Sequence, residues 1–170
     1  MKEIERKYLL NFSPIEYDIS KSILIGQYYL GSKDLDIRVR YELPISNFRD
    51  RAAEGPPVFT LTIKSSEQGE VRTEHTLFLS HKKGLELTTS PLITSFISKI
   101  REFYNVPDIK GRVTIDHFSS EFKSKVTSLI EIEFESEEVS KNFNKKHYSW
   151  IGKEVTNDPF YRNINLANRI

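Results

Sequence analysis

Apolar and polar residues alternate along most of this chain, which is the pattern of β-strands with one apolar and one polar face. The alternation predicts eight strands, at about 2–10, 22–31, 35–43, 57–65, 70–79, 98–105, 111–119 and 128–136. A segment rich in proline and glycine, from Pro44 to Pro57, separates the third strand from the fourth. The sequence therefore predicts a mainly β fold.

A few shorter stretches are expected to be helical. One lies near Pro14 to Ile19, and a second begins at Pro91 and leads into the sixth strand. A third spans about Glu137 to His147. A last short helix is expected after Asp158-Pro159, because Asp is a favourable N-cap residue and Pro a favourable first-turn residue. The stretch from His81 to Gly84 is interpreted as a solvated basic turn.

The polar faces of the strands carry charged residues spaced two apart. Glu3, Glu5 and Lys7 share one face of the first strand, and Glu131 and Glu133 share one face of the last. The strands between them repeat the pattern with Asp36, Arg38, Arg40 and Glu42; Thr60, Thr62 and Lys64; Arg72 and Glu74; Lys99 and Arg101; and Arg112, Thr114 and Asp116.

Two architectures produce such faces. An antiparallel sheet with one solvated face is the commonest source of this alternation. Eight strands can instead close into a barrel, which removes the sheet edges and turns the charged faces into a lumen. Two like charges 4 Å apart repel by roughly 4 kcal/mol at an effective dielectric near 20. A charged lumen is therefore costly unless it binds a cation, a polyanion or both.

Composition narrows the class of protein. The chain has 170 residues, enough for one domain over 1–170, and 38% of them are hydrophobic. A net charge of +1, with no RNA-binding motif, gives no reason to expect a nucleic-acid partner. The absence of cysteine, of a signal peptide and of an apolar run near the ~20 residues of a membrane span leads us to expect a cytoplasmic protein without a membrane partner. The four histidines show no zinc-type spacing.

The charged residues indicate two kinds of ligand. Carboxylate oxygens suit a hard divalent cation such as Mg²⁺ or Mn²⁺. Arginine presents a planar fork that matches phosphate oxygens, and lysine acts as a point charge. Arg112 is a phosphate candidate on strand parity alone, and Arg72 and Glu74 could also pair with each other.

Ordered motifs along nearly the whole chain resemble the CYTH superfamily, the triphosphate tunnel metalloenzymes. They are Glu3-x-Glu5-x-Lys7, Gln27-Tyr28-Tyr29-Leu30, Arg38-x-Arg40, Leu61-Thr62-Ile63-Lys64, Arg72-x-Glu74, Lys99-x-Arg101, Asp116 and Glu131-x-Glu133. The tail from Glu154 to Pro159, with Asn163 and Leu166-Ala167, resembles the ending of the short bacterial members.

The resemblance implies an eight-stranded antiparallel β-barrel that forms a tunnel, with helices outside. It also implies roles for individual residues. The implied metal ligands are Glu3, Glu5, Asp116, Glu131 and Glu133. The implied substrate-binding residues are Lys7, Arg38, Arg40, Lys64, Lys99 and Arg101, to which parity adds Arg72 and Arg112. Lys7, Glu131 and Glu133 are the catalytic candidates, and Glu74 is a further site residue.

The chain departs from the family pattern in two places. Thr76 stands where the family often has a second glutamate, and the segment between the Arg38 and Lys64 strands is longer than in compact members. Phe48 on this segment could fold over the tunnel mouth.

We expect metal-dependent hydrolysis of a triphosphate, with inorganic triphosphate as the first candidate. A class IV-type adenylyl cyclase acting on ATP, a thiamine triphosphatase and a non-catalytic polyphosphate-binding module remain alternatives. Tyr28, Tyr41 or Phe118 could supply the aromatic platform that thiamine needs. A homodimer is compatible with the sequence, which does not define the oligomeric state.

Overall fold

The computed structural model describes residues 2–11, 15, 17–30, 35–65, 71–119 and 126–169. Its principal strands are β1 (Lys2–Leu10), β2 (Ile19–Leu30), β3 (Leu35–Ile45), β4 (Val58–Ser65), β5 (Val71–Leu79), β6 (Ile93–Tyr104), β7 (Gly111–Phe118) and β8 (Ser128–Phe134). The remaining elements are helices α1 (His81–Thr88), α2 (Glu137–Asn142) and α3 (Asn163–Leu166), strands β9 (Ile151–Glu154) and β10 (Asn168–Arg169), and 3₁₀ turns at Lys145–His147 and Pro159–Tyr161. The prediction of a mainly antiparallel β fold with few helices is confirmed.

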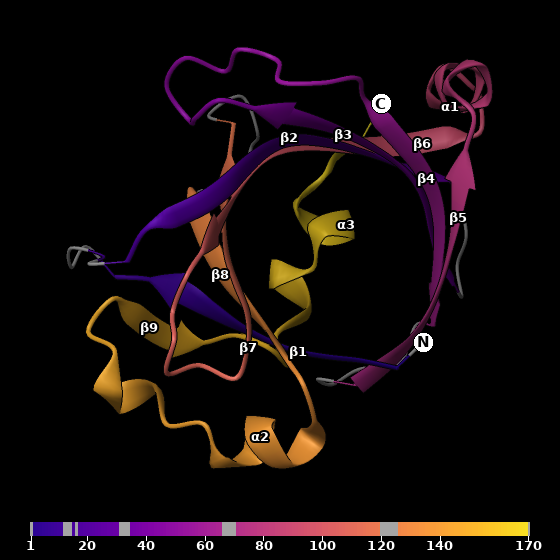
Figure 1. The fold of residues 1–170 in the computed structure, drawn as a ribbon. Helices are drawn as coiled ribbons and strands as arrows, with labels where there is room; N and C mark the ends of the chain where they lie inside the picture. Colours follow the sequence, from indigo (N-terminus) through magenta and orange to yellow (C-terminus); the bar gives the residue numbers. More distant parts are fainter. Residues whose placement is uncertain are drawn as a thin grey trace.

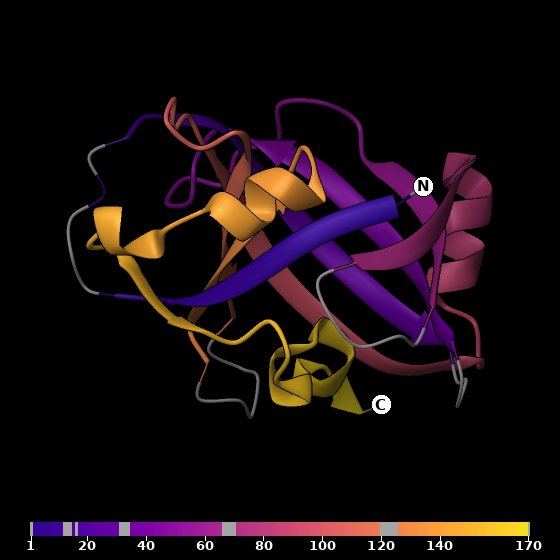
Figure 2. The ribbon, with the colours of Figure 1, turned by 90° about the horizontal axis from the view of Figure 1, so that it is seen from below.

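The principal strands pair in the order β6-β2-β3-β4-β5-β1-β8-β7, and β7 pairs again with β6. The β1–β5 pairing is the shortest and joins Lys2–Ile4 to Val71–Thr73. Figure 1 shows the strands curving around a central space in which α3 is visible. Figure 2, turned by 90°, places α3 at one end of the strands.

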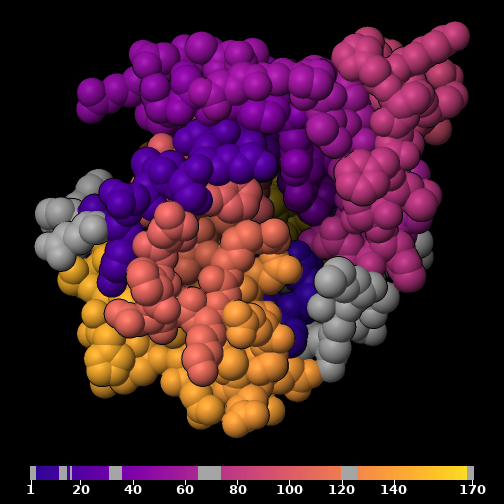
Figure 3. Space-filling model, viewed as in Figure 1, coloured from indigo at the N-terminus to yellow at the C-terminus, as the bar shows by residue number. Residues whose placement is uncertain are grey.

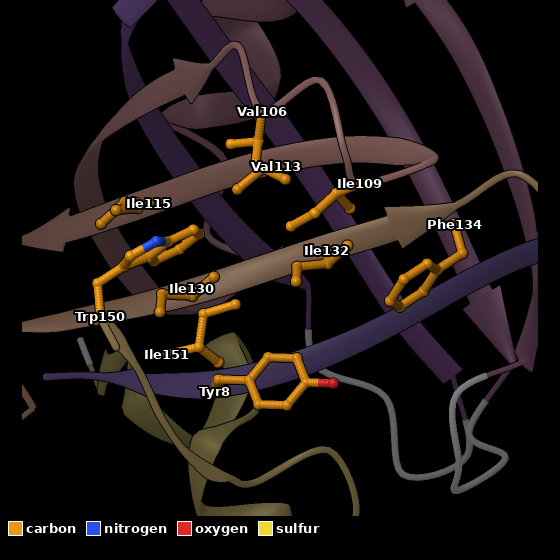
Figure 4. Packing of buried hydrophobic residues seen from close by; sticks show 10 residues of the cluster. All are labelled: Tyr8, Val106, Ile109, Val113, Ile115, Ile130, Ile132, Phe134, Trp150 and Ile151. Atoms are coloured by element: carbon orange, nitrogen blue, oxygen red, sulfur yellow. The ribbon is translucent and has the colours of Figure 1, made fainter. Parts of the chain in front are cut away.

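The largest apolar cluster lies on the face of β1, β7 and β8 that is opposite to their charged residues. Ile130 and Ile132 of β8 are fully buried in it, and each contributes roughly 1.5–3 kcal/mol by leaving water. Trp150 and Ile151, which follow β8 in the chain, pack against these two isoleucines in the same cluster (Figure 4). The apolar faces of these strands therefore pack outward against the C-terminal part of the chain, and the charged faces turn inward.

Helix α1 replaces the basic turn expected at His81 to Gly84. The Ser80 side chain caps it by accepting a hydrogen bond from the Lys83 amide at 3.3 Å. Gly84 packs against Phe59 of β4 so closely that an added Cβ would lie 2.2 Å from the ring. The glycine that suggested a turn is thus required for close packing of a helix.

Other helix predictions are wrong or only partly met. Pro91 lies in a turn and β6 begins at Ile93, so the helix expected there is absent. The helix expected from Glu137 ends at Asn142 and is followed by a separate 3₁₀ turn. The short helix expected after Asp158 is a 3₁₀ turn capped by that residue. The helix expected near Pro14 falls mostly outside the described residues, and Ile19 already belongs to β2.

Candidate functional site

A cavity of about 340 Å³ lies against the charged faces of the strands. Figure 3 shows a hollow on this side of the molecule, with yellow C-terminal atoms at its floor. Most of the residues predicted from strand parity line the cavity: Glu3, Glu5, Lys7, Arg38, Arg40, Lys64, Glu74, Arg101, Arg112, Glu131 and Glu133. The structure thus brings both signs of charge together in one cavity.

Two glutamates of the cavity oppose each other directly. In the β1–β8 ladder Glu5 is the partner of Glu133, and Lys7 is the partner of Glu131. Side chains at directly opposed positions have Cβ atoms about 4.5–5.5 Å apart, and like charges there destabilise a sheet. Burial and the neighbouring Glu5 carboxylate also raise the pKa of Glu3. A bound cation would relieve this repulsion.

Two lysines form ion pairs with the carboxylates of the cavity. Lys7 Nζ lies 2.7 Å from Glu131 Oε1 and 3.2 Å from Glu5 Oε1. Lys64 Nζ lies 2.6 Å from both Glu3 Oε2 and Glu74 Oε2. Each lysine therefore joins carboxylates that come from two different strands.

A buried ion-pair network connects the cavity lining to residues behind it. Arg101 Nε donates to Asp116 Oδ1 at 2.6 Å, and the same guanidinium contacts Glu131. Lys99 also contacts Asp116, whose side chain is fully buried. Burial lowers the pKa of Lys99 to about 8 although Asp116 opposes this. Burial would raise the pKa of Asp116, but Arg101 and Lys99 outweigh it and lower that pKa.

Two predicted site residues, Asp116 and Lys99, belong to this network. Neither Asp116 nor Lys99 is among the described residues that line the cavity. Both instead contact each other, and Asp116 fixes the orientation of Arg101. Metal binding by Asp116 and substrate binding by Lys99 stay predictions, and the structure gives both residues buried partners instead.

Arg38 and Arg40 face the cavity from β3. Arg38 is 4% exposed, and its Nε has no hydrogen-bond partner among the described residues. Arg40 Nη1 lies 3.2 Å from Glu42 Oε1. With its side-chain amide turned so that the oxygen faces Arg40, Gln27 accepts from Arg40 Nη2 at 2.9 Å. Burial and the neighbouring Arg38 lower the pKa of Arg40, so an anion between the two guanidiniums would be stabilising.

Strand β5 lines the cavity with Glu74 and Thr76. The Arg72 side chain lies outside the described part of the structure, although its backbone pairs with Glu3. Thr76, at the position where the family often has glutamate, lines the cavity and donates to Glu74 Oε1 at 2.9 Å.

Residues that sequence reasoning did not select also line the cavity. Strand parity placed Asp36 on the same face of β3 as Arg38, but no site role was assigned to it. Arg162 and Asn163 come from the start of α3. Asn163 belongs to the tail motif, but no strand alternation extends to Arg162, so no pattern in the sequence indicated that residue.

A divalent cation such as Mg²⁺ requires several oxygen ligands around one point. Within the described ranges, no three His, Asp or Glu side chains already surround one point. The side chains that line the cavity nevertheless supply oxygen donors, and the opposed Glu5 and Glu133 carry repulsion that a cation would remove. The residues therefore fit a hard cation, which would replace the ion pairs that Lys7, Lys64, Arg101 and Arg112 make with these carboxylates.

The Lys64–Glu74 ion pair should make the free energy of unfolding depend on pH in the acidic range. Burial favours a higher pKa for Glu74, but Lys64 outweighs it and lowers the pKa from 4.5 to about 2. Because the folded-state pKa is the lower one, ionised Glu74 stabilises the fold above pH 4.5, and this stabilisation is lost as the pH falls toward 2. We expect Glu74→Gln to flatten the fall in unfolding free energy between about pH 5 and about pH 3, measured by urea denaturation in EDTA.

The control is Glu86→Gln on α1. Glu86 pairs with Lys83, but its side chain is 62% exposed. A surface pair of this kind contributes little to stability. Equal pH slopes in the two variants would contradict the assigned Lys64–Glu74 pair.

Known proteins were compared with the chain. No protein-family model matches it. The inorganic triphosphatase of Acetivibrio thermocellus is 29% identical over 167 residues, which cover 98% of this chain and 93% of that protein. The solved structure of the inorganic triphosphatase NE1496 has a TM-score of 0.59 and 25% identity, over 97% of this chain and 93% of that one. The chain has the triphosphate tunnel (CYTH) fold.

A further solved structure has a similar fold. PH1819 from Pyrococcus horikoshii OT3 has a TM-score of 0.56 and 22% identity, over 82% of each chain. The resemblance inferred from the ordered strand motifs is therefore confirmed. None of the helices in the described segments combines the length and the apolar character needed to cross a membrane.

Proposed function

We propose that this protein hydrolyses a triphosphate, with inorganic triphosphate preferred, inside a closed tunnel and with the help of Mg²⁺ or Mn²⁺. One observation carries the proposal: a single cavity combines two opposed glutamates with buried arginines. The pairing of β7 with β6 supports a closed tunnel. The likeness to two proteins named inorganic triphosphatases supports the reaction class.

The acidic side of the cavity would hold the cation. Glu3, Glu5, Glu131 and Glu133 are the proposed ligands. When bound, the cation supplies charge neutralisation and an acidified water. Lys7 already contacts Glu5 and Glu131, so its ammonium group is placed beside the carboxylates and beside any phosphoryl group that joins them.

The basic side of the cavity would hold the phosphate chain. Arg38, Arg40 and Arg101 are anchored on adjacent or nearby strands and need little rearrangement to meet an anion. Donors that are already fixed stabilise the charge that develops on the phosphoryl oxygens in the transition state. Water would then attack the terminal phosphorus while the bond from that phosphorus to the bridging oxygen breaks, so that phosphate and pyrophosphate leave and the protons of the water pass to these products and to solvent. The Asp116–Arg101 contacts keep one of the donors in place.

The lining of the cavity favours an inorganic substrate over the alternatives. No aromatic side chain occurs among the described residues that line it. Phe48, the residue that could have covered the mouth, packs against His117 with ring centroids 5.0 Å apart. Tyr28 packs on Phe96, and Tyr41 packs on Phe59. Adenine or thiamine recognition usually requires a stacking surface, which this cavity lacks within those residues.

A substrate panel tests the proposal. We expect kcat/KM for inorganic triphosphate to exceed that for ATP and for thiamine triphosphate by at least about tenfold, a difference of roughly 1.4 kcal/mol. Pyrophosphate should be a poor substrate, because it is too short to contact the cation and the far arginines together. Phosphate and cyclic AMP are both measured with Mg²⁺ or Mn²⁺.

Each alternative has its own outcome in this panel. Equal turnover of ATP, or formation of cyclic AMP, would replace the proposal with a nucleotide enzyme. A preference for thiamine triphosphate would indicate that the protein is a thiamine triphosphatase. Tight binding of triphosphate without any turnover would leave a polyphosphate-binding module.

A further inference from the structure

The C-terminal segment supplies the floor of the cavity. Leu166 of α3 is 3% exposed and packs in one cluster with Tyr29, Ile97 and Leu129. The preceding turn is fixed by its own hydrogen bonds, since the Arg162 amide donates to the Pro159 carbonyl at 3.1 Å. The residues that begin α3, Arg162 and Asn163, both line the cavity.

Four buried polar atoms of this cavity have no hydrogen-bond partner among the described residues. They are Asp36 Oδ1, Arg38 Nε, Arg162 Nε and Asn163 Oδ1. A buried polar atom left without a partner costs about 1–3 kcal/mol, so native proteins rarely keep several together unless water or a ligand satisfies them. Their presence around one cavity points to a ligand that reaches α3.

The ladder pairings place α3 at the end of the cavity away from the opposed glutamates. Leu129, which packs beside Leu166, and Glu133 lie on the same strand. Strands rise about 3.3 Å per residue, so the interval from 129 to 133 spans about 13 Å along β8. Arg38 is the ladder partner of Tyr29, which packs in the Leu166 cluster, so Arg38 also lies toward this end.

We propose that Arg162 and Asn163 form a second substrate subsite, which binds the phosphoryl group farthest from Glu5 and Glu133. This inference rests on the proposed triphosphatase function. Arg162 and Arg38 donate to the phosphoryl oxygens, because a guanidinium matches them in geometry and charge. Asn163 Oδ1 and Asp36 Oδ1 accept from water that hydrates this group. A chain that is one phosphate shorter cannot reach the subsite, so Arg162 selects for chain length.

The test compares Arg162→Ala with the wild-type protein on two substrates. We expect KM for inorganic triphosphate to rise at least about tenfold, with kcat changed less than about twofold, because a charge-assisted contact to the bound substrate is lost. The kinetic constants for pyrophosphate should not change. The Arg162 side chain makes no capping hydrogen bond to α3, so the variant should keep its fold.

Matched variants separate the subsite from a general charge effect. Arg49→Ala removes the same charge from the exposed segment that follows β3 and should change neither substrate. Arg162→Met keeps the apolar stem in case the alanine variant is destabilised, and it should behave like Arg162→Ala. Unchanged KM for triphosphate, or an equal rise for triphosphate and pyrophosphate, would overturn the proposal.

A binding measurement keeps the two proposals distinguishable. The dissociation constant of inorganic triphosphate is measured by calorimetry in EDTA, where hydrolysis is not required. If the wild-type protein binds but does not hydrolyse triphosphate, the proposed function fails, while a tenfold weaker Kd in Arg162→Ala still supports the subsite. If the wild-type protein hydrolyses triphosphate and the variant is unchanged in KM and Kd, the subsite alone is wrong.

Discussion

Replacing Arg101 by methionine is expected to lower the free energy of unfolding by about 3–5 kcal/mol. The Arg101 side chain is 11% exposed and contacts Asp116, which is fully buried, and Glu131, which is nearly so. Methionine keeps the apolar stem but removes the guanidinium that joins the two carboxylates, which leaves Asp116 with Lys99 and Glu131 with Lys7. Breaking a buried ion pair on one side is costly because it leaves charge without a partner. Urea denaturation of the metal-free protein measures the change.

Arg112→Met provides the matched control. Arg112 also contacts a glutamate of β8, Glu133, but its side chain is 58% exposed. Exposed pairs contribute about 0–1 kcal/mol, so this variant should lose no more than that. Similar losses in the Arg101 and Arg112 variants would show that the buried network does not hold the wall of the cavity.

Replacing Glu133 by glutamine is expected to lower kcat for inorganic triphosphate by more than about tenfold, or at least about 1.4 kcal/mol in transition-state stabilisation. Glutamine keeps the shape of the side chain and removes the charge that would hold the cation beside Glu5. Glu133 is better suited to this test than Glu131, since Glu131 belongs to the buried network and its loss would also affect folding. Steady-state kinetics in saturating Mn²⁺ give the value.

Glu135→Gln is the control for Glu133→Gln. It removes one negative charge two residues further on, at an exposed position beyond the end of β8. Its kcat should stay within about twofold of wild type, and circular dichroism of both variants should match the wild-type spectrum. A wild-type rate for Glu133→Gln would remove this residue from the metal site.

Strand parity predicted most of the site because a sheet repeats every two residues. The spacing of Glu3, Glu5 and Lys7 sufficed to place all three on the inward face, and the same rule placed Glu131 and Glu133. All principal strands occur within a few residues of the expected ranges, apart from β6, which begins five residues early. Apolar and polar residues alternate in these strands because one face packs against apolar side chains and the other face lines the charged cavity.

Features that depend on tertiary contact were not visible in the sequence. Strand parity made Asp116 a metal-ligand candidate on the same grounds as Glu131. The register of β6 and β7, which the sequence does not show, makes Arg101 the ladder partner of Asp116 and pairs the two side chains. Gly84 suggested a turn because its packing against Phe59 cannot be read from local residues. Arg162 was missed since α3 is a short element placed by Leu166, without a strand period to guide it.

The central claim is that the opposed glutamates and buried arginines hydrolyse inorganic triphosphate with a divalent cation. The most direct test is the initial rate of phosphate release from inorganic triphosphate by the purified wild-type protein, with Mg²⁺ or Mn²⁺ and then in excess EDTA. We predict turnover that requires the cation and stops in EDTA, because the carboxylates then lose the charge that joins them to the substrate. Undiminished release in EDTA, or no release with either cation, would contradict the account.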